Sequence, residues 1–317
     1  MMRTAHRRRP GTSLMEVLVG FGILGIGVAS VISLYPFAAL AAGNALIKDR
    51  TTTSALIADG QLRDIHKRFV VEVGEGTGEP YFGPLDRGTG TLPPVPRDSG
   101  EPSYPVFIDP IGFAAGQTGP VGTNTSANVP RTNLSLVTNS GNSVSHALRF
   151  CSQLDGLGYN DDGAVQTGPE MRELRYNWLW VVQRPVNRDR FNLRMQVVVF
   201  NQRIHQYRPS MTETVYPPPA GSSVRTFTPG QTFVNNIPTA AELRKGSWIM
   251  DAGNPAIGLR HAEFYRVTSI ADDGTIEVHR PVRRPDGGTA AYDANVVVMP
   301  GVVDVYERPQ LGSGYGP

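Results

Sequence analysis

Residues able to do catalytic or zinc-binding chemistry are sparse in this sequence. The histidines show no HExxH spacing and the chain has one cysteine, so no zinc site is indicated. The stretch from Gly141 to Ser145 contains serine but lacks the final glycine of a nucleophile elbow. A glycine-rich phosphate loop is also absent from the sequence. We therefore expect that the protein is not an enzyme.

An Asp/Asn/Gly-rich stretch is the candidate for ion binding. The oxygens of Asp155, Asn160, Asp161 and Asp162 could hold Ca²⁺. An EF-hand-type register across this stretch requires an acid at position 158, where the chain has Gly158. We favour a solvated turn and expect no cofactor, with Ca²⁺ binding as the alternative.

A lone carboxylate, Glu16, stands at the start of a long apolar run. From Val17 to Ile47 there is no charged residue, which is enough chain to cross a bilayer as a helix of about 20 residues. A carboxylate inside a membrane costs about 2.5–3.5 kcal/mol or more unless a cation pairs with it. A simple anchor does not need this residue. The alternative is that Glu16 lies in the headgroup layer, where its charge is solvated.

A short basic leader, MMRTAHRRRPG, precedes the apolar run. Its arginines predict a cytoplasmic N-terminus and an exported remainder. The ordered sequence of basic leader, Gly11, four residues, Glu16 and long apolar helix resembles the class III signal of type IV pilins and pseudopilins. The resemblance covers about the first 50 residues, and the run Ile23 to Gly27 is more similar to minor than to major pilins.

This resemblance implies a processing and assembly pathway. A prepilin peptidase would cut between Gly11 and Thr12 and methylate the new amine of Thr12, which makes Glu16 the fifth residue of the mature chain. Glu16 would then pair with the amine of a neighbouring subunit and set the axial register. The implied partners are prepilin peptidase, other pilin or pseudopilin subunits, the inner-membrane assembly platform and the membrane itself.

The implied function is that of a structural subunit, a minor pilin or pseudopilin of a type IV pilus or type II secretion-like filament. We expect a single-pass protein of the bacterial inner membrane with its C-terminal part in the periplasm or in a surface filament. The alternative is a membrane-anchored binding or adhesion protein that uses the same anchor. Removing the four leader arginines changes the formal charge from +2 to −2, and no nucleic-acid partner is expected.

Two other interpretations of the apolar run stay open. Ala39-Leu40-Ala41 resembles a secretory cleavage site, although the run is longer than the ~7–15 apolar residues of a signal peptide. The other is a plain anchor that is never cleaved. Within the run Pro36 predicts a kink, because it lacks an N–H and clashes with the preceding turn. The run also contains four glycines: Gly20, Gly22, Gly25 and Gly27. They fit either close packing against a neighbouring helix or local melting of this helix.

The helix is expected to continue beyond the membrane segment to about Val73. Apolar residues recur there at spacings of three and four, the pattern of one helical face that packs on a globular domain: Ala55, Ala58, Leu62, Ile65 and Phe69. The alternative is a separate helix after a break near Thr51 to Ser54. Residues 74–100 and 116–145 are rich in glycine, proline and small polar residues and predict loops. Between them, Tyr104 to Asp109 is expected either to form a short edge strand or to tuck under the helix.

Strands are predicted in the second half of the chain. Alternation from Leu174 to Val182 and from Phe191 to Val199 predicts an antiparallel hairpin. Packing of Trp178 and Trp180 on the helix is favoured over a ligand platform. Further runs predict a small curled sheet or barrel: Ser247 to Met250, Ala262 to Ile270, Thr275 to Arg280 after an Asp-Gly turn, and Val296 to Tyr306.

The predicted fold class is therefore α+β, with a long N-terminal transmembrane helix of the pilin type packed on an antiparallel β-sheet and a small C-terminal β unit. The expected divisions are a leader (1–11), the helix (12–73, about 14–42 in the membrane), a loop-rich domain with the hairpin (74–210) and the C-terminal β unit (211–317). With one cysteine the chain has no internal disulfide, so burial or neighbouring subunits must hold it together.

Overall fold

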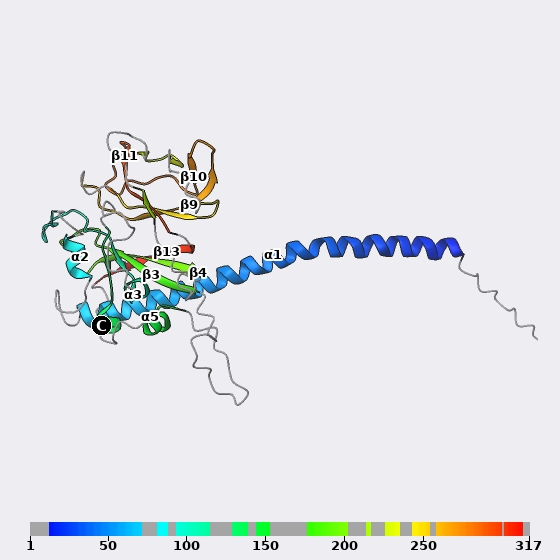
Figure 1. Cartoon of the computed structure of the whole chain (residues 1–317), viewed down its shortest axis with the longest axis horizontal. Coiled ribbons are helices and arrows are strands. Elements are labelled where there is room, and N and C mark those ends of the chain that lie inside the picture. Colours follow the sequence, from blue (N-terminus) through cyan, green and yellow to red (C-terminus); the bar gives the residue numbers. More distant parts are fainter. Residues whose placement is uncertain are drawn as a thin grey trace, which may run out of the picture. The chain divides into compact units, whose positions relative to one another are not determined.

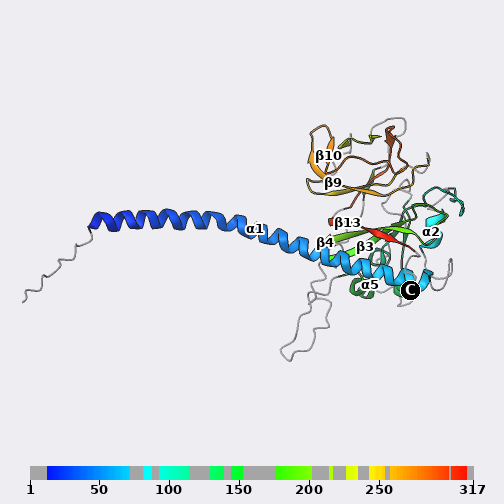
Figure 2. The same ribbon diagram turned by 180° about the vertical axis from the view of Figure 1, so that it is seen from behind.

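The chain has an α+β fold, with one long N-terminal helix and two β-sheets (Figure 1). The computed structural model describes residues 13–71, 81–87, 93–114, 129–138, 144–152, 176–201, 214–216, 226–234, 243–253, 258–299 and 301–312. The chain divides into two compact units, Met1–Arg50 and Thr51–Pro317. Figure 2 shows the same elements from behind.

The N-terminal helix, α1 (Leu14–His66), continues without interruption through Pro36. A π-helical turn, η1 (Lys67–Val71), follows it. Residues 51–54 lie inside α1, so the alternative of a break there is wrong. The helix persists because this stretch contains neither proline nor glycine to interrupt it.

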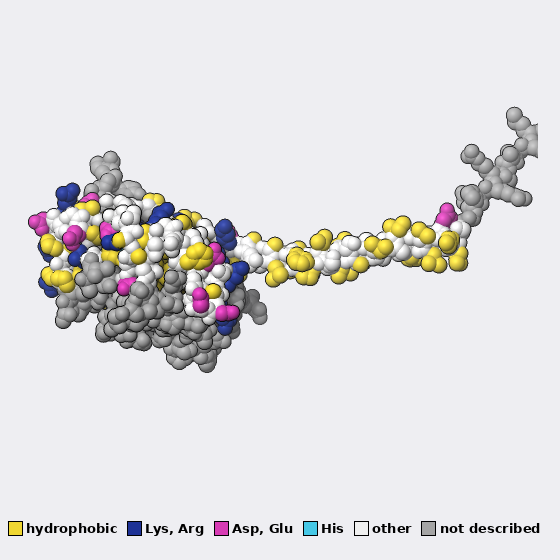
Figure 3. Space-filling view, turned by 90° about the horizontal axis from the view of Figure 1, so that it is seen from above, with side chains coloured by type: hydrophobic (Ala, Val, Ile, Leu, Met, Phe, Trp, Pro, Cys, Tyr) yellow, Lys and Arg dark blue, Asp and Glu magenta, His cyan; other side chains and the backbone are white. Residues whose placement is uncertain are grey.

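Within the N-terminal unit the large apolar side chains of α1 are exposed, and Figure 3 shows those on one face of the helix in yellow. Among the described residues α1 is the one helix long and apolar enough to cross a membrane. A helix that is apolar all round requires an apolar environment, because water would otherwise solvate every face.

The first sheet has the strand order β13-β4-β3-β1-β2. The predicted hairpin is confirmed: β3 and β4 are antiparallel, with Trp178 opposite Val199 and Trp180 opposite Val197. The strand β1 lies between β3 and β2, so the expected edge strand at Tyr104 to Asp109 is in fact internal. It is parallel to β2, which makes this sheet mixed. The bounds are β1 (Val106–Ile108), β2 (Arg131–Thr132), β3 (Tyr176–Gln183), β4 (Leu193–Asn201) and β13 (Val302–Leu311).

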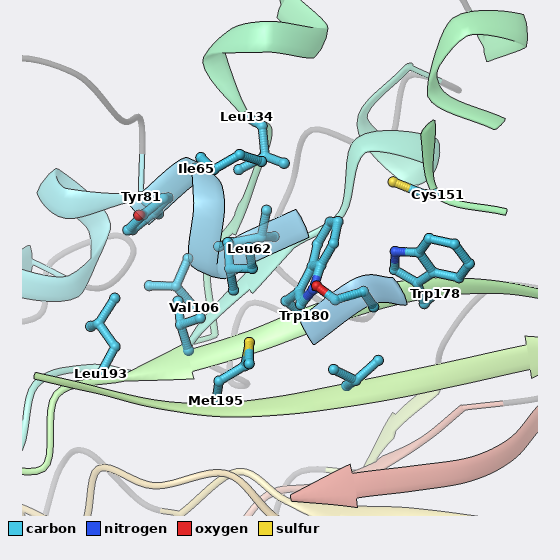
Figure 4. Packing of buried hydrophobic residues seen from close by; sticks show 14 of the residues in the cluster. Leu62, Ile65, Tyr81, Val106, Leu134, Cys151, Trp178, Trp180, Leu193 and Met195 are labelled. Atoms are coloured by element: carbon cyan, nitrogen blue, oxygen red, sulfur yellow. The ribbon is translucent and has the colours of Figure 1, made fainter. Parts of the chain in front are cut away.

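The C-terminal part of α1 packs on one face of this sheet (Figure 4). Ala55, Ala58, Leu62 and Ile65 of the predicted stripe are buried, while the exposure of Phe69 is not described. The alanines let the strands approach the helix backbone, and the indole Nε1 of Trp180 donates a hydrogen bond of 2.9 Å to the carbonyl oxygen of Ala58. Both tryptophans belong to this core, so the packing interpretation is confirmed.

The opposite face of the first sheet is also buried, which the sequence pattern did not indicate. Leu179 and Val181 were expected to alternate away from the core, yet they lie in a second apolar cluster. A second sheet supplies the other side of that cluster, through Trp248, Met250 and Phe264. The hairpin is therefore the middle layer between α1 and the second sheet.

The second sheet has eight strands in the order β11-β6-β7-β10-β9-β8-β12-β5. They are β5 (Thr214–Tyr216), β6 (Thr226–Phe227), β7 (Phe233–Val234), β8 (Trp248–Asp251), β9 (Glu263–Ile270), β10 (Ile276–Val278), β11 (Tyr292–Asp293) and β12 (Val296–Val298). The predicted turn between β9 and β10 is confirmed, and Gly274 adopts a φ of 82° there. A third apolar core is drawn from strands of this sheet and from the segments that connect them, with no residue from the first sheet, which fits a sheet that curls around its own core.

Along the chain, all eight strands of the second sheet come after β4 and before β13. These two strands are themselves antiparallel neighbours in the first sheet. The expected single run from Val296 to Tyr306 is divided, because β12 ends at Val298 in the second sheet and β13 begins at Val302 in the first. The second sheet is thus an insertion into a β-hairpin. Residues 211–317 supply strands to both sheets.

Short helices occur in regions expected to be loops. They are α2 (Phe82–Arg87), α3 (Pro110–Ala114), α4 (Ser135–Thr138) and α5 (Val144–Phe150). Pro84 lies in the first turn of α2, where its missing N–H breaks no helical hydrogen bond. The loop prediction for 74–100 and 116–145 is therefore wrong at α2, β2, α4 and the first residues of α5. The helix α3 lies between these two stretches, and most of their remainder lies outside the described residues.

Candidate functional site

The start of α1 is held by a reciprocal capping box between Ser13 and Glu16. The backbone N–H of Ser13 donates to Oε2 of Glu16 at 3.1 Å, and the backbone N–H of Glu16 donates to Oγ of Ser13 at 3.3 Å. These two bonds satisfy donors that a helix N-terminus leaves unpaired. The carboxylate is exposed, so the cap leaves it accessible from outside the chain.

Glu16 shares one face of α1 with two of the glycines. Gly20 and Gly27 follow it by four and eleven residues, which brings them round to the same side of a helix. A Cβ at either glycine would meet no atom within 4 Å. Packing within the chain therefore does not require these glycines, and a neighbouring helix could approach their bare backbone closely.

The two serine hydroxyl groups of the apolar segment are satisfied within the helix. Oγ of Ser30 donates to the carbonyl oxygen of Ile26, and Oγ of Ser33 donates to that of Ser30, both at 2.8 Å. Such bonds lower the cost of placing serine in a medium without water. This segment is compatible with hydrocarbon or with packing among other apolar helices.

The exposed apolar surface of α1 is longer than a bilayer requires. The uncharged run from Val17 to Ile47 spans about 46 Å as a helix. The hydrocarbon core of a bilayer is about 30 Å thick. Near the far end of the run, Leu40 is 67% exposed and Leu46 is 61% exposed. About ten residues of apolar helix thus exceed what a perpendicular span would cover.

The other residues singled out in the sequence are outside the described residues. These are the processing positions Gly11 and Thr12 and the possible calcium ligands Asp155, Asn160, Asp161 and Asp162. In the described ranges there is no group of three or more His, Cys, Asp or Glu able to hold a metal ion. The processing site and the Ca²⁺ alternative stay predictions.

The second sheet contains a buried polar cluster that the sequence did not reveal. Oδ2 of Asp251 accepts hydrogen bonds from Nε2 of His261 at 2.9 Å and from the hydroxyl of Tyr292 at 2.5 Å. Oδ1 accepts a bond from the backbone N–H of Gly253 at 2.8 Å. The partners are separated along the chain and no motif connects them. Both side chains of the Asp251–His261 pair are at most 1% exposed, so the cluster is structural.

This cluster controls the ionisation of His261. Burial by itself would lower the pKa of the imidazole, but the negative charge of Asp251 outweighs it and raises the pKa above the ordinary value of 6.5. Glu263 adds to the rise and Arg194 opposes it. His261 is thereby favoured as a cation paired with Asp251.

Two further ionic clusters join the layers. Asp86 in α2 binds Arg184 at 2.8 Å and Arg190 at 2.7 Å, which fastens the β3–β4 connection to α2. Between the sheets, Glu263 of β9 contacts Arg194 of β4 and Arg280, and Arg280 contacts Glu307 of β13 at 3.0 Å. Burial would raise the pKa of Glu307, but Arg280 and Arg194 outweigh this effect and lower it.

Comparisons with known proteins add little to this description. No family model matches the chain, and no curated protein matches it. Among solved structures the Phage phi92 endosialidase aligns with 12% sequence identity and a TM-score of 0.20, covering 43% of this chain and 18% of that one. A likeness this low carries no argument about fold or function.

We predict that His261→Gln lowers the free energy of unfolding by about 3 kcal/mol near pH 6, because it removes one member of a buried ion pair. Since the folded-state pKa of His261 is raised, the pair stabilises the protein fully below the unfolded pKa and loses that effect as pH rises through the folded pKa. The difference from wild type should therefore shrink at alkaline pH.

Urea unfolding at several pH values measures this difference. His146→Gln is the matched control, because His146 is exposed at the start of α5. A loss of stability independent of pH, or the same pH dependence in both variants, would contradict the ion-pair interpretation.

Proposed function

We propose that this protein is a structural subunit, a minor pilin or pseudopilin of a type IV pilus or type II secretion-like filament. In this proposal prepilin peptidase removes Met1–Gly11, Thr12 becomes the methylated N-terminus, and α1 carries the subunit into the filament. The remainder is exported from the bacterial inner membrane. The observation that carries the proposal is the apolar surface of α1 beyond the length that a bilayer covers.

The excess apolar length distinguishes an assembly helix from an anchor. An anchor needs about 20 apolar residues, and additional exposed apolar surface in water would be unfavourable by about 25 cal/mol per Å². Neighbouring apolar helices would cover this surface in a filament. A simple anchor that tilts within the bilayer would cover part of the additional apolar length. Tilting gives no reason for a carboxylate at the start of the helix.

Glu16 supports the same proposal. Its carboxylate is exposed and lies on the face that carries Gly20 and Gly27. A cation supplied by another subunit, for which the freed amine at Thr12 is the candidate, would offset the cost of placing Glu16 among apolar helices. The assembly platform and the other subunits would then meet this face of α1.

A second function has its own support. The second sheet is inserted into a hairpin and has its own apolar core, as an added binding module would. In this alternative the protein is a membrane-anchored surface binding or adhesion protein. The alternative requires the anchor but not a charged Glu16, so the two functions can be separated by mutation.

We predict that Glu16→Gln leaves membrane insertion and N-terminal processing intact but lowers recovery in filaments about tenfold or more. Glutamine can still form the capping box with Ser13, so this variant removes the charge and keeps the cap. Immunoblots of sheared filaments and of membranes measure the two pools.

Ser13→Ala is the matched control, because it weakens the cap and keeps the carboxylate. We expect this variant to assemble nearly as well as wild type. Equal assembly of Glu16→Gln and wild type would favour the anchored binding protein. Equal loss in both variants would reduce the role of Glu16 to helix capping.

We also predict that Leu46→Gln inserts in the membrane like wild type but enters filaments poorly. Leu46 lies about ten residues beyond a 20-residue span that starts at Val17, so an anchor would place it outside the hydrocarbon. Leu46→Met, which keeps the apolar surface, is the control. Normal filament entry of Leu46→Gln would contradict burial of this segment among subunits.

A further inference from the structure

The strand β13 is a long edge strand. It pairs with β4 on one side and, among the strands that the structure describes, is the outermost one of the first sheet. A free sheet edge presents backbone N–H and C=O groups on which another chain can add a strand. Ten residues of edge would be an efficient template for pairing with a second copy of the chain, so the contacts that block this edge are informative.

Side chains from two other elements bind backbone carbonyls of β13. The indole Nε1 of Trp248, in β8 of the second sheet, donates to the carbonyl oxygen of Val303 at 3.2 Å. Nη2 of Arg63, in α1, donates to the carbonyl oxygen of Pro309 at 2.7 Å. These donors occupy acceptors near both ends of the strand that an incoming strand would otherwise use.

The strand also blocks itself. Pro309 has no N–H to offer, and Oδ1 of Asp304 accepts a bond of 2.9 Å from the N–H of Val305. The pairing with β4 is irregular between Val302 and Asp304 and again between Arg308 and Leu311. Irregular pairing of this kind twists an edge away from the flat geometry that strand addition needs.

The two donors are themselves held in place. Nε of Arg63 donates to Oδ1 of Asp59 one turn earlier in α1, at 2.7 Å. The ring of Trp248 lies in the core between the sheets and has an edge contact with His279, with ring centroids 5.6 Å apart. Their positions therefore depend on both α1 and the inserted sheet being docked.

We propose that Trp248, Arg63, Asp304 and Pro309 form an edge guard that prevents β13 of one copy from pairing with β13 of another. With this edge blocked, copies of the chain associate only through surfaces other than the sheet edge. Because two of its members come from α1 and the second sheet, it is complete only in the fully folded chain. This inference does not depend on the proposed pilin-like function.

The test uses the full chain, with one copy in each lipid nanodisc so that α1 helices of different copies cannot meet. The open-edge variant combines Trp248→Phe, Arg63→Met and Pro309→Thr, which remove the two donors and restore one N–H. We expect association between discs, measured by mass photometry, to strengthen about tenfold or more relative to wild type. The amides of β13 should gain protection from hydrogen exchange in the associated discs.

Trp180→Phe is the matched control, because it also deletes an indole N–H that binds a backbone carbonyl but leaves the edge unchanged. If the folded open-edge variant stays as single discs, or if the control associates equally, the proposal is wrong. Should the triple variant fail to fold, Pro309→Thr alone provides the test. A folded Pro309→Thr variant with no increase in association would overturn the proposal.

Discussion

The packing of α1 on the β3–β4 hairpin is the contact on which the rest of the structure depends. The small side chains of Ala55 and Ala58 let Trp178 and Trp180 lie against the helix, and the indole of Trp180 reaches the helix backbone itself. This contact makes the C-terminal part of α1, from Thr51 onward, part of the same folded unit as the sheets.

The other face of the β3–β4 hairpin packs against a second layer. Leu179 and Val181 pack against the inserted sheet, so almost the whole of β3 is buried. Ionic contacts among Arg194, Glu263, Arg280 and Glu307 join the two sheets at the side of this interface. Double-sided burial and ion pairs hold the unit from Thr51 onward together, in a chain whose single cysteine permits no internal disulfide.

The sequence patterns predicted the elements whose structure depends on residues close together in the chain. The stripe from Ala55 to Ile65, the β3–β4 hairpin and the turn at Gly274 are confirmed, because periodicity and turn chemistry depend on neighbouring residues. The burial of Leu179 was missed because the residues that cover it, such as Trp248 and Phe264, come from an inserted sheet far along the chain. The pairing of β13 with β4 is equally non-local.

The candidate sites also divide into those with a local sequence signal and those that only the fold brings together. Glu16 was evident because a carboxylate beside a long apolar run is unusual, and its capping partner Ser13 completes a recognised local motif. The Asp251–His261 pair and the Trp248 contact with β13 carry no sequence signal, since each joins residues brought together only by the fold. The assignment of Gly11 and Thr12 still rests on resemblance.

The proposed entry of this chain into a pilus-type assembly pathway is tested most directly at its N-terminus. The measurement is the intact mass and N-terminal sequence of the full-length protein recovered from membranes with and without a functional prepilin peptidase. The account predicts a chain that starts at methylated Thr12 when the peptidase is present and at Met1 when it is absent. A start near Ala42 or Gly43, or an uncut Met1 in the presence of the peptidase, would contradict it.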